Sequence, residues 1–396
     1  MVNSGCETRF YYFKKKNLKI IICVIGCNLS PLLFSIFIDS LGYELNNTNL
    51  GISLGNVNIS SLFFADDIVI LGKNKAALDS LMDITRKFFK SHHLELSASK
   101  SKTLSFEATT GETIFAGDQD LDPISLQQVA CFKYLGVTVS SSSYRFFSAH
   151  NERVKAKARQ YLQSVLSLVR TGPDRVDLAF TLWSSCALPA ILYGCEVVPL
   201  NQGTINEIEN CQARVGKFML QVQNSSSSVC SNIDAGFRPV WAVIAERVMI
   251  YASRLMDKHP SNWTKLALQE HLDNPTNSNY MKYLNRWKDA TNSFGVPQSQ
   301  IRRNVYHYAV KDVLDRQRIT STSAFAMNGP GTVPGSRWFQ PKKWVKDSAF
   351  TKIFAEFRTC NVRLGNRCPT LDGRFFKLCP LCQSKGEAAL NNEVII

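Results

Sequence analysis

Cysteine is sparse in this sequence, with 12 residues among 396, and so low a density does not support a disulfide-stabilised scaffold. A cleavable secretory signal is also lacking. Reduced thiols in an intracellular protein, in the nucleus or the cytoplasm, are therefore expected. Apolar residues make up 45% and charged residues 20%, which is typical of a globular chain and leaves room for two or three domains.

Acidic residues are few relative to basic ones. The chain has 32 Asp and Glu against 46 Lys and Arg, which gives a formal net charge of +14 and an isoelectric point near 9.2. A chain of this charge favours a polyanionic partner, and nucleic acid before a membrane surface.

One mostly apolar run, residues 18–38, follows a basic segment and is about long enough to cross a bilayer. A membrane anchor is therefore one interpretation of this run. Polar residues interrupt it, and Ser30 as a cap with Pro31 in the first turn predicts a helix start. We favour that second interpretation, in which an apolar helix over 31–41 is buried beneath a sheet.

The adjacent carboxylates Asp66 and Asp67 stand between two apolar runs in the stretch 61–72. Runs rich in Phe, Ile and Val on both sides of a tight turn predict strand, turn and strand, with the carboxylates exposed at the tip. Two neighbouring like charges favour a bound cation, and carboxylate oxygens together with substrate phosphates suit Mg²⁺. Such ions serve nucleotidyl transfer. An ordinary Asp-Asp turn between strands is the alternative.

Three further blocks accompany this stretch: Gly26–Phe34, Ser99–Thr103 and Phe132–Gly136. Together with Phe64-Ala65-Asp66-Asp67 they resemble, in order and spacing, the motifs of reverse transcriptases of non-LTR (LINE-type) retrotransposons. The resemblance implies an α/β polymerase palm, partial here, followed by an α-helical thumb and a mostly helical C-terminal region. The implied activity is RNA-directed DNA polymerisation with Mg²⁺, an RNA template and a DNA primer.

The resemblance also assigns roles to individual residues. Asp66 and Asp67 bind metal beside the primer terminus, and Lys100 stabilises the departing pyrophosphate, although Lys100 in a solvated turn is equally compatible with the sequence. Gly26 lies close to the nascent base pair, where a side chain would collide with substrate. The implied contacts to substrate and primer backbone come from Phe64, Ala65, Lys133, Tyr134 and Gly136.

One carboxylate of the family has no match. It belongs upstream of the Gly26 block, and the acids before Asp66 are Glu7, Asp39 and Glu44, none of which fits its motif. We therefore expect a C-terminal fragment without the fingers and the first palm motif, and a catalytically incomplete remnant. A non-catalytic nucleic-acid-binding protein is the alternative.

The sequence after the hairpin predicts a helix from a cap at Asn74 to about His92, with an apolar side facing the sheet. Because His92 and His93 are adjacent, they cannot share a helix face, and we interpret them as a helix end rather than metal ligands. The stretch 94–106 predicts strand, turn and strand, and 107–127 is irregular.

A helix is predicted over 151–170, and its first half is basic. Arg153 and Lys157 are four residues apart, as are Lys155 and Arg159, so a basic stripe could follow nucleic-acid phosphates. A solvated surface face is the alternative. Further helices are predicted up to 193–194, over 206–221 and, after a flexible joint at 224–228, over 241–256. The expected divisions are 1–25 leader, 26–140 partial palm, 141–258 thumb-like region and 259–396 C-terminal region.

The C-terminal Cys379 and Cys382 have the spacing of half a zinc site. A structural zinc ion needs four ligands, so a second pair must complete it. Cys360 and Cys368 lie upstream at an unusual spacing. The sequence therefore does not decide whether this half-site, a partial zinc knuckle, binds zinc, and less than one zinc ion per chain is expected.

Overall fold

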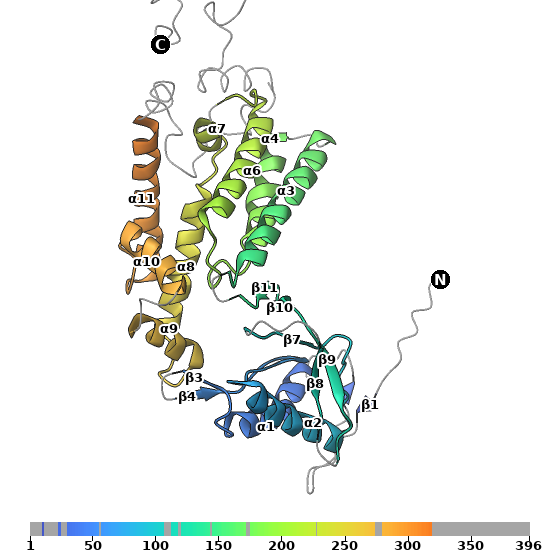
Figure 1. Ribbon diagram of the computed structural model, residues 1–396. Helices are drawn as coiled ribbons and strands as arrows, with labels where there is room; N and C mark the ends of the chain where they lie inside the picture. Colours follow the sequence, from blue (N-terminus) through green and yellow to red (C-terminus); the bar gives the residue numbers. More distant parts are fainter. Residues whose placement is uncertain are drawn as a thin grey trace, which may run out of the picture. The chain divides into compact units, whose positions relative to one another are not determined.

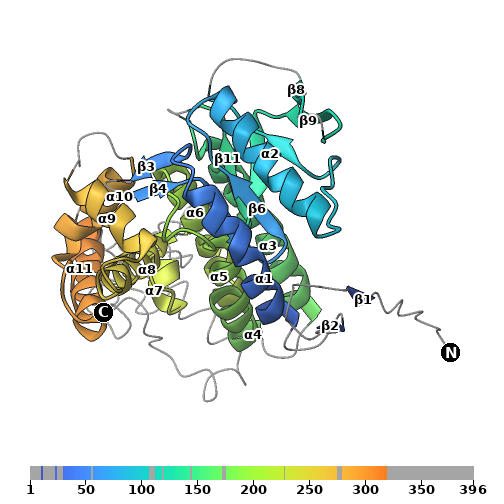
Figure 2. The same ribbon diagram turned by 90° about the horizontal axis from the view of Figure 1, so that it is seen from below.

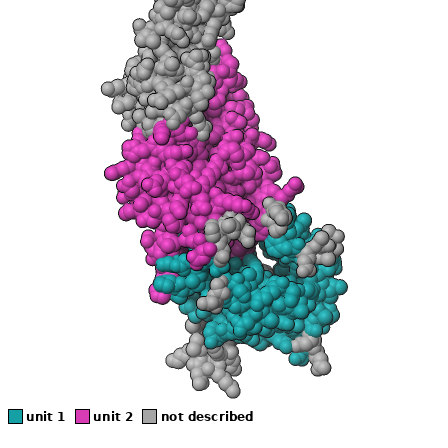
Figure 3. Space-filling model, turned by 60° about the vertical axis from the view of Figure 1, so that its left-hand side comes forward, with its two compact units in different colours: residues 1–132, 140–144, 260–270 teal, residues 133–139, 145–259, 271–396 magenta. Residues whose placement is uncertain are grey.

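The computed structural model describes residues 10–11, 23–24, 30–54, 57–106, 112–117, 120–142, 145–171, 175–226, 228–273 and 279–318. The chain divides into two compact units, coloured in Figure 3. The first consists of 1–132, 140–144 and 260–270, and the second of 133–139, 145–259 and 271–396. The N-terminal region is mixed α/β with small sheets and the region after it is mostly helical, in agreement with the predicted fold class at this level.

Helix α1 (Ser30–Asn46) begins where the Ser-Pro pair predicts a helix start, and it continues past the predicted end at residue 41. One side of the helix is buried through Ile38, Leu41 and Leu45. The prediction that the helix is a buried element is wrong for its other side, which exposes three large apolar side chains: Leu32, Ile36 and Tyr43. An apolar composition therefore does not distinguish the covered side of this helix from the uncovered one.

The predicted hairpin is formed by β5 (Ser61–Phe64) and β6 (Asp67–Ile70). Helices α1 and α2 (Lys75–Ser91) lie side by side and pack against these strands (Figures 1 and 2). As predicted, α2 is capped by Asn74, whose side-chain oxygen accepts a 2.9 Å hydrogen bond from the Ala77 amide, and His92 is the C-cap at its other end. The core between the helices is Ile38, Leu41, Leu45, Leu81 and Phe88.

The remaining strands of the first unit form small sheets. β1 (Phe10–Tyr11) pairs with β2 (Cys23–Val24), and β3 (Ile52–Leu54) with β4 (Val57–Ile59). A three-stranded sheet has β9 (Ile124–Gln128) between β7 (Lys102–Thr103), which is parallel to it, and antiparallel β8 (Glu112–Phe115).

Two predictions for this region are wrong. Residues 107–127 are not irregular throughout, because β8 and most of β9 lie there, held by the burial of Phe115 and Leu126. Of the stretch 94–106, only 102–103 forms a strand. Both errors come from strands so short that only one or two side chains carry the alternating pattern.

β10 (Cys131–Tyr134) and β11 (Val137–Ser140) form a hairpin that contains the Phe132–Gly136 block. Residues 133–139 of this hairpin belong to the second unit. The thumb-like helices are α3 (Ser148–Thr171), α4 (Arg175–Thr181), the π-helical η1 (Leu182–Ala187), α5 (Leu188–Ile191) and α6 (Gln202–Leu220). The predicted helices are confirmed, but α3 and α6 begin earlier than predicted. For α6 the reason is Asn201, whose side chain accepts a 2.8 Å hydrogen bond from the Thr204 amide and caps the helix.

The chain continues through α7 (Ser228–Asp234), α8 (Val240–Met256), α9 (Trp263–Asp273), α10 (Asn279–Thr291) and α11 (Gln298–Arg318). The predicted joint at 224–228 contains the turn between α6 and α7, which pack against each other. Helix α8 confirms the helix predicted over 241–256. Within the described residues, no helix has the length and the apolar character needed to cross a bilayer.

Candidate catalytic hairpin and nucleic-acid interface

The Asp66–Asp67 pair sits on a two-residue turn. Phe64 is paired with Asp67, so Ala65 and Asp66 form the turn and Asp67 is the first residue of β6. Ala65 has a φ of 52°, in the left-handed region, which costs a residue with a Cβ about 1–2 kcal/mol. The tight reversal therefore leaves both carboxylates exposed at one end of the hairpin.

Two contacts hold this hairpin in place. The pair Phe63 and Ile68 contributes to the core of α1 and α2, while Phe64, pointing the other way, is 61% exposed. The side-chain oxygen of Asn46, at the end of α1, accepts hydrogen bonds from the amides of Ser60 and Ser61 at 2.8 and 3.3 Å. The helix end is thus tied to the start of β5.

The donor set of the hairpin fits part of a magnesium site. Asp66 and Asp67 provide hard oxygen ligands, and neither carboxylate forms a hydrogen bond or an ion pair with another described residue. Among the described residues there is no group of three His, Cys, Asp or Glu side chains able to hold a metal ion. The pair could therefore supply two of the ligands of a divalent cation.

Other predicted site residues lie elsewhere. Lys100 is exposed in the turn before β7, and its ammonium group has no hydrogen bond or ion pair within the described part of the chain. Phe64 and Ala65 belong to the hairpin itself. Several predicted features lie outside the described residues: Gly26, Glu7, Cys360, Cys368, Cys379 and Cys382.

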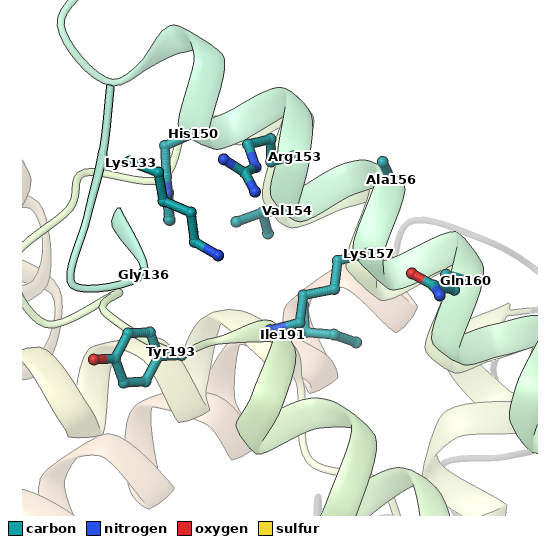
Figure 4. A pocket seen from close by; sticks show the side chains of 10 residues that line it. All are labelled: Lys133, Gly136, His150, Arg153, Val154, Ala156, Lys157, Gln160, Ile191 and Tyr193. Atoms are coloured by element: carbon teal, nitrogen blue, oxygen red, sulfur yellow. The ribbon is translucent and has the colours of Figure 1, made fainter. Parts of the chain in front are cut away.

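The second unit has a basic pocket of about 450 Å³ where the β10–β11 turn meets α3 (Figure 4). None of its lining residues is acidic; they are Lys133, Gly136, His150, Arg153, Val154, Ala156, Lys157, Gln160, Ile191 and Tyr193. Four residues that the sequence predicts to bind nucleic acid therefore line one cavity: Lys133, Gly136, Arg153 and Lys157. Tyr134 is half-buried in β10 and is not among the lining residues.

The turn beside the pocket has an unusual backbone. Leu135 and Gly136 have φ values of 44° and 85°, the paired positive values of a tight hairpin turn. The hydroxyl of Tyr193 donates a 3.2 Å hydrogen bond to the Leu135 oxygen. A Cβ on Gly136 would lie 2.8 Å from the Tyr193 ring, so only glycine fits there without movement.

Helix α3 separates the four predicted basic residues onto two faces. Residues four apart lie on the same side of a helix, whereas residues two apart lie on nearly opposite sides. Arg153 and Lys157 line the pocket, Arg153 donating to the Thr138 hydroxyl at 2.9 Å and Lys157 to the Ala190 oxygen at 2.5 Å.

Lys155 and Arg159 are not lining residues, and both are in ion pairs. Lys155 pairs with Glu152 at 2.8 Å and Arg159 with Glu207 of α6 at 2.6 Å. The hydrogen bond that Arg159 donates to Glu207 raises the pKa of the Arg159 guanidinium. The stripe that the sequence predicts is thus divided between a pocket face and a paired face.

His150 is a pocket residue that was not predicted from the sequence. It is 5% exposed, and its Nδ1 accepts a 3.2 Å hydrogen bond from the Thr138 amide. Burial, followed by the charges of Arg153 and Lys157, lowers the His150 pKa. Its spacing of three and seven residues before these two cations is a sequence signal that could have placed it on their face.

The cations also influence one another. Burial, and then the charge of Lys133, lowers the pKa of the Lys157 ammonium. With no carboxylate among the lining residues to offset this charge, the pocket is suited to an anion.

Comparison with known proteins gives relatives for the segment that contains the carboxylate hairpin and the β10–β11 turn. Residues 14–139 match the reverse transcriptase (RNA-dependent DNA polymerase) family model. This range includes Asp66, Asp67, Lys100 and the β10–β11 turn, and it begins upstream of Gly26 in a segment that the motifs leave unplaced. The match agrees with the resemblance drawn from the sequence blocks.

Three Pol polyproteins are distantly similar to the chain. Two "Retrovirus-related Pol polyprotein from type-1 retrotransposable element R2" sequences of Popillia japonica are 25% and 26% identical to it, over 53% and 52% of this chain and 34% and 28% of their own lengths. The corresponding type-2 R2DM polyprotein of Drosophila melanogaster is 27% identical over 30% of this chain and 12% of its own length. The chain thus spans about a third or less of these relatives. Its relatives are non-LTR retrotransposon proteins of the R2 kind.

Proposed function

We propose that the chain is a reverse-transcriptase-related protein of a non-LTR retrotransposon that binds an RNA template and a DNA primer inside the cell. The observation that carries this proposal is the Phe64–Asp67 turn. It exposes two carboxylates that have no partner among the described residues, inside the range that matches reverse transcriptases. Asp66 and Asp67 would hold Mg²⁺, which when bound activates an attacking oxygen and stabilises a leaving one. The protein's own part is to keep these carboxylates positioned through the Asn46 and Phe63 contacts.

We propose further that these 396 residues alone do not complete the polymerase site. The family resemblance calls for another carboxylate, and Asp39 and Glu44 lie on α1 rather than on a strand. Primer extension on an RNA template with Mg²⁺ or Mn²⁺ tests this directly. Extension at background is expected. Template-dependent synthesis that is lost in Asp66→Ala but retained in Asp79→Ala, a change of an α2 acid that pairs with Lys75, would show that another group completes the site.

Nucleic-acid binding without catalysis is the second candidate, and the basic pocket of the second unit favours it. Phosphate contacts release counterions, so affinity for RNA should fall steeply with salt concentration. Fluorescence anisotropy with labelled RNA at several salt concentrations measures this slope. If the folded chain does not bind RNA at low salt, the proposed binding function is wrong, regardless of the result of primer extension.

A further inference from the structure

His150 carries a hydrogen-bond donor that the folded chain does not use. Because its Nδ1 accepts from the Thr138 amide, the hydrogen of the neutral ring lies on Nε2. Nε2 is buried and has no hydrogen-bond partner among the described residues. Buried polar groups are nearly always paired, so an unpaired donor in a cavity wall points to a ligand that supplies the acceptor.

The surroundings of His150 define the charge of that ligand. Lys133, Arg153 and Lys157 line the same pocket, and the lining includes no acid (Figure 4). Burial and the charges of Arg153 and Lys157 lower the His150 pKa, so the ring is neutral at physiological pH and keeps its donor arrangement. Three cations and one neutral donor match a compact anion with several acceptor oxygens.

We propose that this pocket holds a single phosphate group of a polynucleotide backbone, with His150 Nε2–H donating to one oxygen and Arg153, Lys157 and Lys133 balancing the charge. The inference rests on the proposed nucleic-acid binding and assigns a specific donor within it. Nε2 is shielded from solvent, and Lys133 and Arg153 are exposed long side chains. Access of a phosphate to Nε2 requires a side-chain movement, for which these two exposed side chains have the freedom.

The salt dependence of RNA binding distinguishes a neutral hydrogen-bond donor from the cations of the pocket. Loss of the His150 donor weakens binding without removing a charge, so the salt dependence keeps its slope. Neutralising Arg153 weakens binding and also reduces the slope by about 0.7 for single-stranded RNA. Substitution of a residue that only stabilises the fold would not separate a loss of affinity from a change in the salt slope in this way.

Two substitutions of His150 separate its two nitrogens. In His150→Asn, the amide oxygen can replace Nδ1 and accept from Thr138, but the distal donor is lost. In His150→Gln, the amide nitrogen can replace Nε2, while the Thr138 contact is lost. His150→Asn should bind labelled 5′-hydroxyl RNA about tenfold more weakly at unchanged slope, the effect of one hydrogen bond to a charged group. His150→Gln should bind nearly as the unchanged protein does, even if it unfolds at a lower temperature.

The source of the phosphate is distinguished by using the same RNA with a 5′-phosphate. An equal loss on both RNAs supports a backbone phosphate. A loss confined to the 5′-phosphorylated RNA overturns that assignment in favour of a terminal phosphate. Equal affinity of His150→Asn and the unchanged protein on both RNAs, or weaker binding by His150→Gln than by His150→Asn, overturns the role of Nε2.

If the chain does not bind RNA at all, the proposed nucleic-acid binding is wrong. Binding of inorganic phosphate then tests separately whether the pocket is a phosphate site. Thermal stabilisation by phosphate, relative to chloride at equal ionic strength, should occur in the unchanged protein and in His150→Gln and be reduced in His150→Asn. Stabilisation that is equal in all three, or absent from all three, would refute the phosphate site.

Discussion

The phenol hydroxyl of Tyr193 donates a hydrogen bond to the main-chain oxygen of Leu135, 3.2 Å away, across a separation of 58 residues in the sequence. This bond joins the end of the α4–η1–α5 segment to the turn of the β10–β11 hairpin. The ring also lies against Gly136, so the hairpin turn and one wall of the basic pocket are held by the same side chain.

Gly136→Ala should loosen this turn. The φ of 85° costs an alanine about 1–2 kcal/mol, and its methyl group would also press on the Tyr193 ring. Hydrogen exchange of residues 131–140, measured by mass spectrometry, should become faster. Adding Tyr193→Ala removes the steric contact but leaves the backbone cost, so recovery should be partial when the double variant is compared with Tyr193→Ala alone, which lacks the same hydrogen bond to Leu135. Full recovery would show that the backbone cost is negligible.

Ala65→Gly should stabilise the carboxylate turn. Glycine adopts a φ of 52° freely, and the relief of about 1–2 kcal/mol exceeds the loss of about 0.5–1 kcal/mol that its flexibility brings. Slower hydrogen exchange of residues 61–70 is the expected readout. Ala267→Gly, in the middle of α9, is the matched control and should destabilise its helix by about 1 kcal/mol. Faster hydrogen exchange of residues 61–70 in Ala65→Gly would show that the backbone at Ala65 is not strained.

The two faces of α3 should differ in their response to neutralisation. Replacing Arg153 and Lys157 by Gln should weaken RNA binding and reduce the slope of log affinity against log salt by about 1.4 for single-stranded RNA, or 0.7 for each contact. Replacing Lys155 and Arg159 should change the slope little, because each is already paired with a carboxylate. Equal effects of the two double variants would mean that the whole helix, and not the pocket, contacts RNA.

His150 should make the stability of the second unit depend on pH. Its folded pKa is lowered, so the unfolded chain binds more protons than the folded one when the pH falls below the ordinary histidine value of about 6.5. The stabilisation is complete above that pH and is lost as the pH falls through the folded pKa. Urea unfolding followed by tryptophan fluorescence should show this loss, since Trp183 is fully buried in this unit. His150→Asn should reduce the pH dependence; an unchanged dependence would assign it to other groups.

Local patterns predicted the elements that local forces determine. The hairpin around Asp66, the Asn74 cap and the basic helix follow from alternation, capping and periodicity within a few residues. Which side of α1 is covered depends on chain segments far away, and composition alone did not show it. The partner of His150 is the Thr138 amide, brought near by a hairpin turn, so its free nitrogen could not be read from the sequence.

The core beneath the carboxylate hairpin is assembled from neighbouring chain. Every described residue of that cluster, from Phe34 to Leu94, belongs to one segment that contains α1, β5, β6 and α2. Its contacts between α1 and α2, such as Phe37 with Phe88, close a loop inside this segment, and the entropy lost in closing a loop grows only slowly with its length. During synthesis this segment can therefore fold as it leaves the ribosome, before α3 has been translated. The apolar side of α1 that stays uncovered would then face the growing chain from the earliest stage of folding.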